Sequence, residues 1–160
     1  IATTYADCLG ELANQLAATT AGVPMQRIHN DPGTWNVLWR PEGPLLMDLD
    51  DFDVGPVAID LATMHFPWRL DTIPEDAPAD EKWAQQRALV LSLYREVADF
   101  PESWEAMFDP LRTLRGVFFD AWFSARWRDP GFAEHYPKDN PEDPAWWAKR
   151  IEQLTERLQG

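Results

Sequence analysis

Apolar residues recur at intervals of three and four along much of the chain, the spacing that places them on one face of an α-helix. The pattern predicts four helices, over residues 3–21, from 80 to about 98, over 110–127 and over 146–158. On the third of these, Phe118, Trp122 and Phe123 are expected to form one buried aromatic face. Asp80 is the expected cap of the second helix.

The pattern changes between the first two helices. Residues 25–28 form a short extended piece, and two four-residue apolar runs, 37–40 and 45–48, are expected to be strands. Residues 57–66 suit a short buried helix, whereas 67–80 and 128–144 are rich in proline and acidic residues and are expected to be loops. The elements together indicate an α+β fold that is mostly helical and contains a small β-hairpin.

The hairpin predicts a cluster of oxygen ligands. Pro41, Glu42 and Gly43 separate the two strands, and a three-residue loop commonly ends on a left-handed glycine. With that loop Asn36 faces Asp48, and directly opposed residues lie about 5 Å apart at Cβ. Asp31 precedes Asn36 by five residues. An amide oxygen and carboxylates that converge in this way suit Mg²⁺.

Other interpretations of this polar stretch remain open. Asp31 and Asn36 could equally hydrogen-bond a turn, as aspartate and asparagine often do. A D-x-D motif at Asp48 and Asp50 is also typical of haloacid dehalogenase phosphatases, but that fold needs a doubly wound sheet and the chain predicts too few strands. A calcium loop does not fit, because Phe52 occupies a ligand position.

Composition and charge narrow the class of protein. The 160 residues suffice for one domain with a core, and the formal net charge of −13 disfavours a nucleic-acid partner. No apolar run approaches the roughly 18 residues of a membrane helix, so we expect no membrane partner. Cys8 is the single cysteine and excludes an internal disulfide, which is compatible with a cytoplasmic location.

A family resemblance rests on two segments, "HNDPGTWNVLW" and "LLMDLDDFDVGPVAIDLA". They resemble the catalytic core of the aminoglycoside phosphotransferase/choline kinase superfamily, a branch of the protein-kinase-like fold. The hairpin from Arg40 to Asp51 and the helix that begins at Pro110 resemble a stress-response subfamily of Ser/Thr protein kinases. The likeness spans most of the chain. It implies that residues 1–160 form the C-terminal, catalytic lobe of an ATP-dependent kinase.

The resemblance also implies roles for five residues. Asp31 would be the catalytic residue that accepts or orients the proton of the substrate hydroxyl, while Asn36 and Asp48 would bind Mg²⁺ against the phosphates of ATP. His29 would pack under the catalytic loop, and Asp60 would bind backbone groups of that loop. Both would be structural supports of the site. The acceptor would be a hydroxyl of a protein or of a small molecule.

Some parts of a kinase are not found in the sequence. Its eight glycines never occur as G-x-G, and its three lysines lie in helical or loop context, so the Gly-rich loop and the strand lysine of a kinase are missing. We therefore expect the N-terminal ATP-binding lobe to be absent from this chain. The chain alone should be inactive, and an apolar surface left uncovered near the hairpin should favour self-association.

The loop between the expected catalytic residues departs from the family pattern. Asn30 replaces a glycine, Gly33 replaces a second histidine, and Trp35 replaces a small residue. Three interpretations follow: a Ser/Thr protein kinase lobe, a kinase of a small molecule such as a sugar, choline or an antibiotic, and a degenerate lobe that only binds a partner. The acidic residues around 75–81 leave the second open, and the altered loop slightly favours the third.

Overall fold

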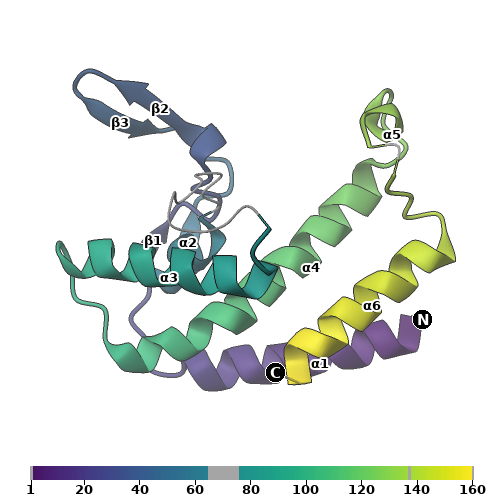
Figure 1. Cartoon of the computed structure of the whole chain (residues 1–160), viewed down its shortest axis with the longest axis horizontal. Helices are drawn as coiled ribbons and strands as arrows, with labels where there is room; N and C mark the ends of the chain where they lie inside the picture. Colours follow the sequence, from purple (N-terminus) through teal and green to yellow (C-terminus); the bar gives the residue numbers. More distant parts are fainter. Residues whose placement is uncertain (1, 65–75, 137, 160) are drawn as a thin grey trace. The chain divides into compact units, whose positions relative to one another are not determined.

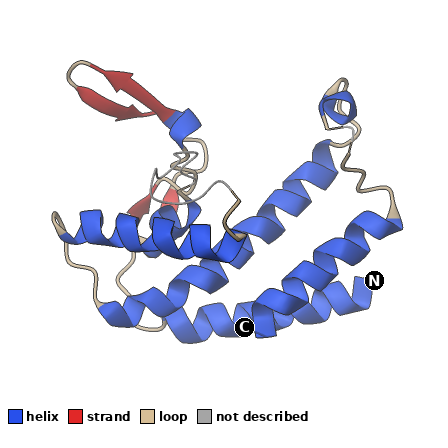
Figure 2. Cartoon of the chain, viewed as in Figure 1, coloured by secondary structure: helices blue, strands red, loops and turns tan. Residues whose placement is uncertain are grey.

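A computed structural model describes residues 2–64, 76–136 and 138–159. The chain divides into two compact units, one of residues 1–21 with 109–160 and one of residues 22–108 (Figure 1). Helices dominate, and the strands form two small antiparallel pairs (Figure 2). The predicted mostly helical α+β fold is therefore confirmed. Part of the loop expected over 67–80, and the end of the helix expected over 57–66, lie outside the described residues.

In the unit of residues 22–108, two short strands join segments that are distant in sequence. Strand β1 (Gln26–Ile28) pairs antiparallel with β4 (Asp53–Gly55), with Arg27 opposite Val54. Strand β4 leads into helix α2 (Ala58–Thr63). The chain that precedes Asp31 is thus fixed beside the start of α2.

The hairpin consists of β2 (Val37–Arg40) and β3 (Gly43–Leu46). Its register pairs Arg40 with Gly43 and Val37 with Leu46, so the loop has two residues, Pro41 and Glu42. The expected three-residue loop is therefore wrong, and with it the register that placed Asn36 opposite Asp48. The difference arises at Gly43. This glycine has a positive φ of 124°, as expected for a loop residue, yet it pairs with Arg40 and is therefore the first residue of β3.

Three further helical segments lie in the described part of this unit. Helix α2 contacts both helix α3 (Ala79–Arg95) and the 3₁₀ segment η2 (Glu102–Met107). Another 3₁₀ segment, η1 (Thr34–Asn36), directly precedes β2. Pro78 occupies the cap position of α3, so the expected cap, Asp80, lies instead in the first turn. Acidic residues in a first turn still interact favourably with the helix dipole. The buried apolar residues of the unit include Leu61, Leu91, Phe100, Met107 and Phe108.

The other unit is a set of helices: α1 (Ala2–Thr20), α4 (Phe108–Arg126), α5 (Phe132–His135) and α6 (Pro144–Gln159). Helices α1 and α6 pack side by side (Figure 1), and Tyr5 makes an edge-to-face contact with Trp147 at 5.5 Å. Leu12, Leu111, Phe123 and Leu154 are buried here. The short helix α5 lies inside a segment that was expected to be loop. None of the described helices is long and apolar enough to cross a membrane.

The expected aromatic face of α4 is only partly correct. Phe123 is 2% exposed, but Phe118 is 50% and Trp122 is 37% exposed. Successive residues of a helix are about 100° apart, so Phe123 lies about 140° around the helix from Phe118. Phe118 and Trp122 therefore share one face, and Phe123 belongs to another.

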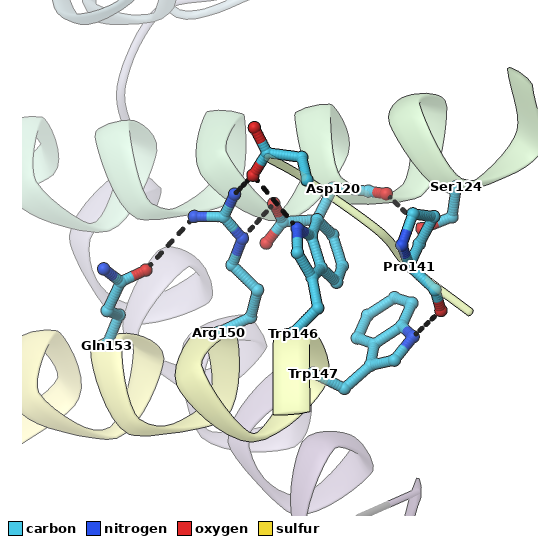
Figure 3. A network of polar contacts seen from close by, with 8 residues as sticks. Asp120, Ser124, Pro141, Trp146, Trp147, Arg150 and Gln153 are labelled. Atoms are coloured by element: carbon cyan, nitrogen blue, oxygen red, sulfur yellow. Dashed lines mark hydrogen bonds and ion pairs between the residues drawn. The ribbon is translucent and has the colours of Figure 1, made fainter. Parts of the chain in front are cut away.

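A partly buried arginine, Arg150, joins α4 to α6 (Figure 3). Arg150 Nε lies 3.3 Å from Asp120 Oδ1, while Arg150 Nη2 lies 3.6 Å from Asp139 Oδ1 and Nη1 donates to Gln153. The guanidinium also stacks over the Trp146 ring at 4.7 Å. These contacts hold a charged side chain between two helices by surrounding it with opposite charge and an aromatic face.

Candidate functional site

Asp31 and Asn36 are joined by two hydrogen bonds. Asn36 Nδ2 donates to the backbone oxygen of Asp31 at 2.9 Å and to Asp31 Oδ2 at 3.1 Å. Asn36 ends η1 and is only 7% exposed, and its backbone N–H donates to the oxygen of Gly33 at 2.8 Å. The loop from Asp31 to Asn36 is therefore closed on itself, and it fixes the position of the Asp31 carboxylate.

Asp60, in the first turn of α2, holds the chain that enters this loop. Its Oδ2 accepts the backbone N–H of His29 at 2.9 Å, and its Oδ1 accepts that of Asn30 at 2.7 Å. Both bonds are charge-assisted, the stronger class of hydrogen bond. A carboxylate in α2 thus fixes two consecutive peptide groups just before Asp31.

Asn30 lies between these anchors with a φ of 68°. Left-handed backbone is costly for most residues, but glycine and, after it, asparagine adopt it most readily. An asparagine can therefore stand where the family usually has glycine without a change of backbone path. Asn30 is therefore a residue type that this left-handed position tolerates.

His29 connects the loop to the chain after β3. Its side chain is 3% exposed, and its Nε2 lies 2.8 Å from the backbone oxygen of Met47. Because a carbonyl only accepts, Nε2 carries the hydrogen, and Nδ1 is buried with no hydrogen-bond partner among the described residues. His29 therefore holds Met47, the residue that precedes Asp48, against the start of the loop.

Asp48 follows β3 in the left-handed region, with a φ of 58°. Its neighbour Met47 donates its N–H to the backbone oxygen of Asn36 at 2.8 Å, so Met47 and not Asp48 lies across from Asn36. The alternation of side chains along a strand ends where the backbone turns left-handed, so the strand register does not set the direction of the Asp48 side chain. Asp48 is exposed.

Trp35 and Gly33 pack against each other inside the same loop. A Cβ added to Gly33 would collide with three ring atoms of the Trp35 indole. Gly33 has a φ of −60°, so space and not backbone conformation requires glycine there. The indole is nevertheless 56% exposed, whereas the next residue, Asn36, is buried. The large side chain at 35 thus fills the volume that a side chain at 33 would take.

The residues present fit a Mg²⁺ ion held mainly by phosphate and water. Both hydrogen bonds from the Asn36 side chain to Asp31 use Nδ2, which leaves Oδ1 as a ligand atom. Asp31 and Asp48 offer carboxylates, and one or two protein ligands are typical of Mg²⁺ sites completed by phosphates. Within residues 2–64, 76–136 and 138–159, no three His, Cys, Asp or Glu side chains gather closely enough to hold a metal by themselves.

Sequence reasoning singled out Asp31, Asn36, His29 and Asp60, and the structure hydrogen-bonds Asn36 to Asp31 and His29 to Asp60. The backbone of Met47 links the two pairs, because it bonds to both His29 and Asn36. Sequence reasoning did not identify the Met47 carbonyl, since a backbone atom leaves no mark in the sequence. The contact between Gly33 and Trp35 was also missed, although the two departures from the family pattern stood only two residues apart.

Family comparison agrees with this geometry. Residues 2–100 match the model of the phosphotransferase enzyme family. The chain therefore belongs to that family, whose fold is kinase-like, and the predicted membership is confirmed.

The similar proteins are kinases by name. Stress response kinase A of Salmonella paratyphi A (strain ATCC 9150 / SARB42) is 33% identical to the chain, and the protein of that name from Escherichia coli (strain K12) is 31% identical. Serine/threonine protein kinase RdoA of Salmonella typhimurium is 33% identical. Each match covers 131 residues, which is 82% of this chain and 36% of the relative. The chain thus spans about a third of the length of these relatives.

Proposed function

We propose that the chain is the catalytic lobe of an ATP- and Mg²⁺-dependent kinase that phosphorylates serine or threonine hydroxyls of proteins. The observation that carries the proposal is the closed loop from Asp31 to Asn36, in which one amide is bonded to both the backbone and the carboxylate of Asp31. The name of the similar serine/threonine protein kinase RdoA supports the choice of acceptor. The proposal includes a cytoplasmic location.

In this proposal Asp31 accepts or orients the proton of the attacking hydroxyl. Its carboxylate is positioned by Asn36, and the backbone before it is held by Asp60. Asn36 and Asp48 would hold Mg²⁺, which would neutralise charge on the phosphates of ATP. Phosphoryl transfer depends mainly on positioning and electrostatic stabilisation. The hydrogen bonds of Asn36 and Asp60 supply the positioning, because they hold the loop that carries Asp31.

The hairpin patch supports a missing second lobe. We define it as the exposed apolar residues of the hairpin and the segment after it: Leu38, Trp39, Leu45, Leu46, Met47 and Leu49. Neighbouring positions of a strand point to opposite faces, so within the described residues both faces of the hairpin present exposed apolar side chains. We propose that another part of the parent protein covers the patch and supplies the Gly-rich loop and the strand lysine.

The test is a phosphoryl-transfer assay with ATP and Mg²⁺ on the full-length parent protein and on this chain alone. The parent should phosphorylate a Ser/Thr protein substrate, and the chain alone should not. In the parent, Asp31→Ala should lower the rate by about 10²–10⁴-fold, the range for a positioned acid–base group. Asp7→Ala, a change at an exposed aspartate of α1, is the control and should have no effect.

Two other functions remain alternatives with distinct results in the same assay. Transfer to small-molecule hydroxyls, and not to protein, would favour a small-molecule kinase, which the broad family description also covers. A folded, ATP-binding parent with no transfer would favour a degenerate binding module. The backbone of Asn30 disfavours a degenerate site, because asparagine adopts the left-handed conformation that a glycine at this position would also allow.

A further inference from the structure

The loop that carries Asp31 also carries a large aromatic surface. Trp35 lies between Gly33, which its indole covers, and Asn36, which is bonded to Asp31. More than half of the Trp35 surface is exposed, while Asn36 beside it is buried. One side of the short η1 segment thus fixes Asp31, and another side presents an indole to solvent.

We propose that Trp35 is a specificity-determining residue, which contacts the polypeptide acceptor next to the serine or threonine that is phosphorylated. This inference rests on the proposed function. A hydroxyl that reaches Asp31 must approach the closed loop between Asp31 and Asn36, because the hydrogen bonds of Asn36 keep both ends of that loop together. The residues that flank the hydroxyl therefore pass within reach of the indole.

The packing of the pair gives the indole a fixed position. An exposed tryptophan on an ordinary turn would sample several rotamers, and its ordering on binding would cost entropy. Here the ring packs directly on Gly33, so closely that a Cβ at this position would collide with it. A rigid aromatic side chain with little entropy left to lose is the kind that dominates recognition surfaces. Gly33 is accordingly a positioning residue for Trp35.

A purely structural role for Trp35 predicts different behaviour. If the indole only filled the space above Gly33, its removal would loosen the loop and disturb Asp31 and Asn36 together. Turnover and the KM for ATP would then change along with the KM for the acceptor. If Trp35 instead contacts the acceptor, its removal should change the KM for the acceptor and the preference among acceptors, but not the KM for ATP.

The experiment uses the full-length parent and a positional library of Ser/Thr peptides, in which each flanking position is fixed in turn. Wild-type protein should discriminate among residues at one position close to the acceptor. Trp35→Ala should abolish that preference and raise the KM of the preferred peptide about tenfold, the effect of losing one good contact. Trp35→Phe should keep most of the preference. Phe118→Ala removes a half-exposed aromatic side chain from α4, outside the loop and the hairpin patch, and should leave the preference intact.

A second pair of variants separates recognition from packing. Gly33→His alone should reduce turnover, because its side chain collides with the indole. The double variant Gly33→His with Trp35→Gly removes the collision and should recover turnover without the wild-type peptide preference.

The outcomes are distinct. An unchanged peptide preference in an active Trp35→Ala variant would overturn this inference and leave the proposed function standing. Equal changes in the KM for ATP and for peptide would also overturn it, in favour of a structural role. Absence of transfer by the wild-type parent to any acceptor would overturn the proposed function and this inference together.

Discussion

Asn36 donates to both the backbone oxygen and the carboxylate of Asp31, at 2.9 and 3.1 Å. The two bonds occupy Nδ2 and direct the amide oxygen of Asn36 away from Asp31. The same residue therefore fixes the proposed catalytic carboxylate and offers a ligand atom to a metal.

Metal binding by this chain should centre on Asn36 and Asp48. In the isolated chain we expect weak binding, because ATP phosphates normally complete the coordination of Mg²⁺. Paramagnetic Mn²⁺ should broaden the backbone NMR signals of these two residues at the lowest metal concentrations. Asp48→Asn keeps the shape of the side chain and should reduce the effect. Broadening that begins at Asp76 and Asp80 would contradict the assignment.

Asp60 should contribute more to stability than other aspartates of its unit. It accepts two backbone N–H bonds, from His29 and Asn30, and bonds to charged groups are each worth about 1.5–3 kcal/mol. Asp60→Ala should therefore lower the free energy of unfolding by about 2–4 kcal/mol, since part of the loss is recovered by water. Asp51→Ala, at an exposed position, should change it by no more than about 0.5 kcal/mol. Urea unfolding followed by circular dichroism measures both, and equal losses would contradict the role of Asp60.

The hairpin patch should cause the isolated chain to self-associate. Contiguous exposed apolar surface of this kind is typical of interaction sites. Trp39→Lys places a charge in the patch and should shift the chain toward monomer in sedimentation velocity over a wide concentration range. Val97→Lys changes another exposed apolar residue of the same unit, outside the patch, and serves as the control. If both variants act alike, association does not depend on the hairpin.

Helices were predictable because their apolar faces are long and periodic. The expected helix over 3–21 corresponds to α1 (Ala2–Thr20), and the one over 146–158 to α6 (Pro144–Gln159). Strand β4 (Asp53–Gly55) was missed because three residues carry no periodic signal, and its partner β1 lies far away in sequence. The second hairpin strand was placed two residues late, since a glycine suggests a loop and Gly43 is instead its first residue.

The site was predictable where side chains bond to one another or to nearby backbone. Motif spacing pointed to Asp31, Asn36 and Asp60, and these make the bonds that define the loop. The left-handed backbone at Asp48 was not foreseen, because no glycine marks it. The register argument failed at the hairpin loop, because Gly43 pairs with Arg40, and the left-handed backbone at Asp48 also interrupts the alternation of side chains.

Phe123 should be the main core residue of α4. It is almost fully buried and contacts Trp146 and Phe132 at ring distances of 5.9 and 5.2 Å. Phe123→Ala should destabilise the chain by about 3–5 kcal/mol, the usual cost of removing a buried phenylalanine. Phe118→Ala, at a half-exposed position on the other face, should cost about 1 kcal/mol. Thermal unfolding of the two variants compares them, and similar losses would restore the single aromatic face expected from the sequence.

The charge of Asp120 should make the stability of the fold depend on pH. Burial raises the pKa of this carboxyl above its ordinary value of 3.8; Arg150 and Arg157 act in the opposite direction, and Asp139 adds to the rise. A group with a raised pKa in the folded state stabilises the fold fully below its ordinary pKa, and this contribution is lost as the pH rises through the folded pKa. Asp120→Asn cannot titrate, so its stability relative to the wild type should increase from about pH 4 toward neutral pH.

The pH series needs a control that leaves titration unchanged. Ser124 donates to the backbone oxygen of Asp120 at 2.7 Å, so Ser124→Ala disturbs the same turn of α4 without removing an ionisable group. Its difference from the wild type should stay constant with pH. Tyr5, whose pKa is also raised by burial and by Asp120, titrates far above the range and does not interfere. Urea unfolding at several pH values gives the free energies, and a constant difference for Asp120→Asn would show that its carboxyl has the same proton affinity in the folded and unfolded chain.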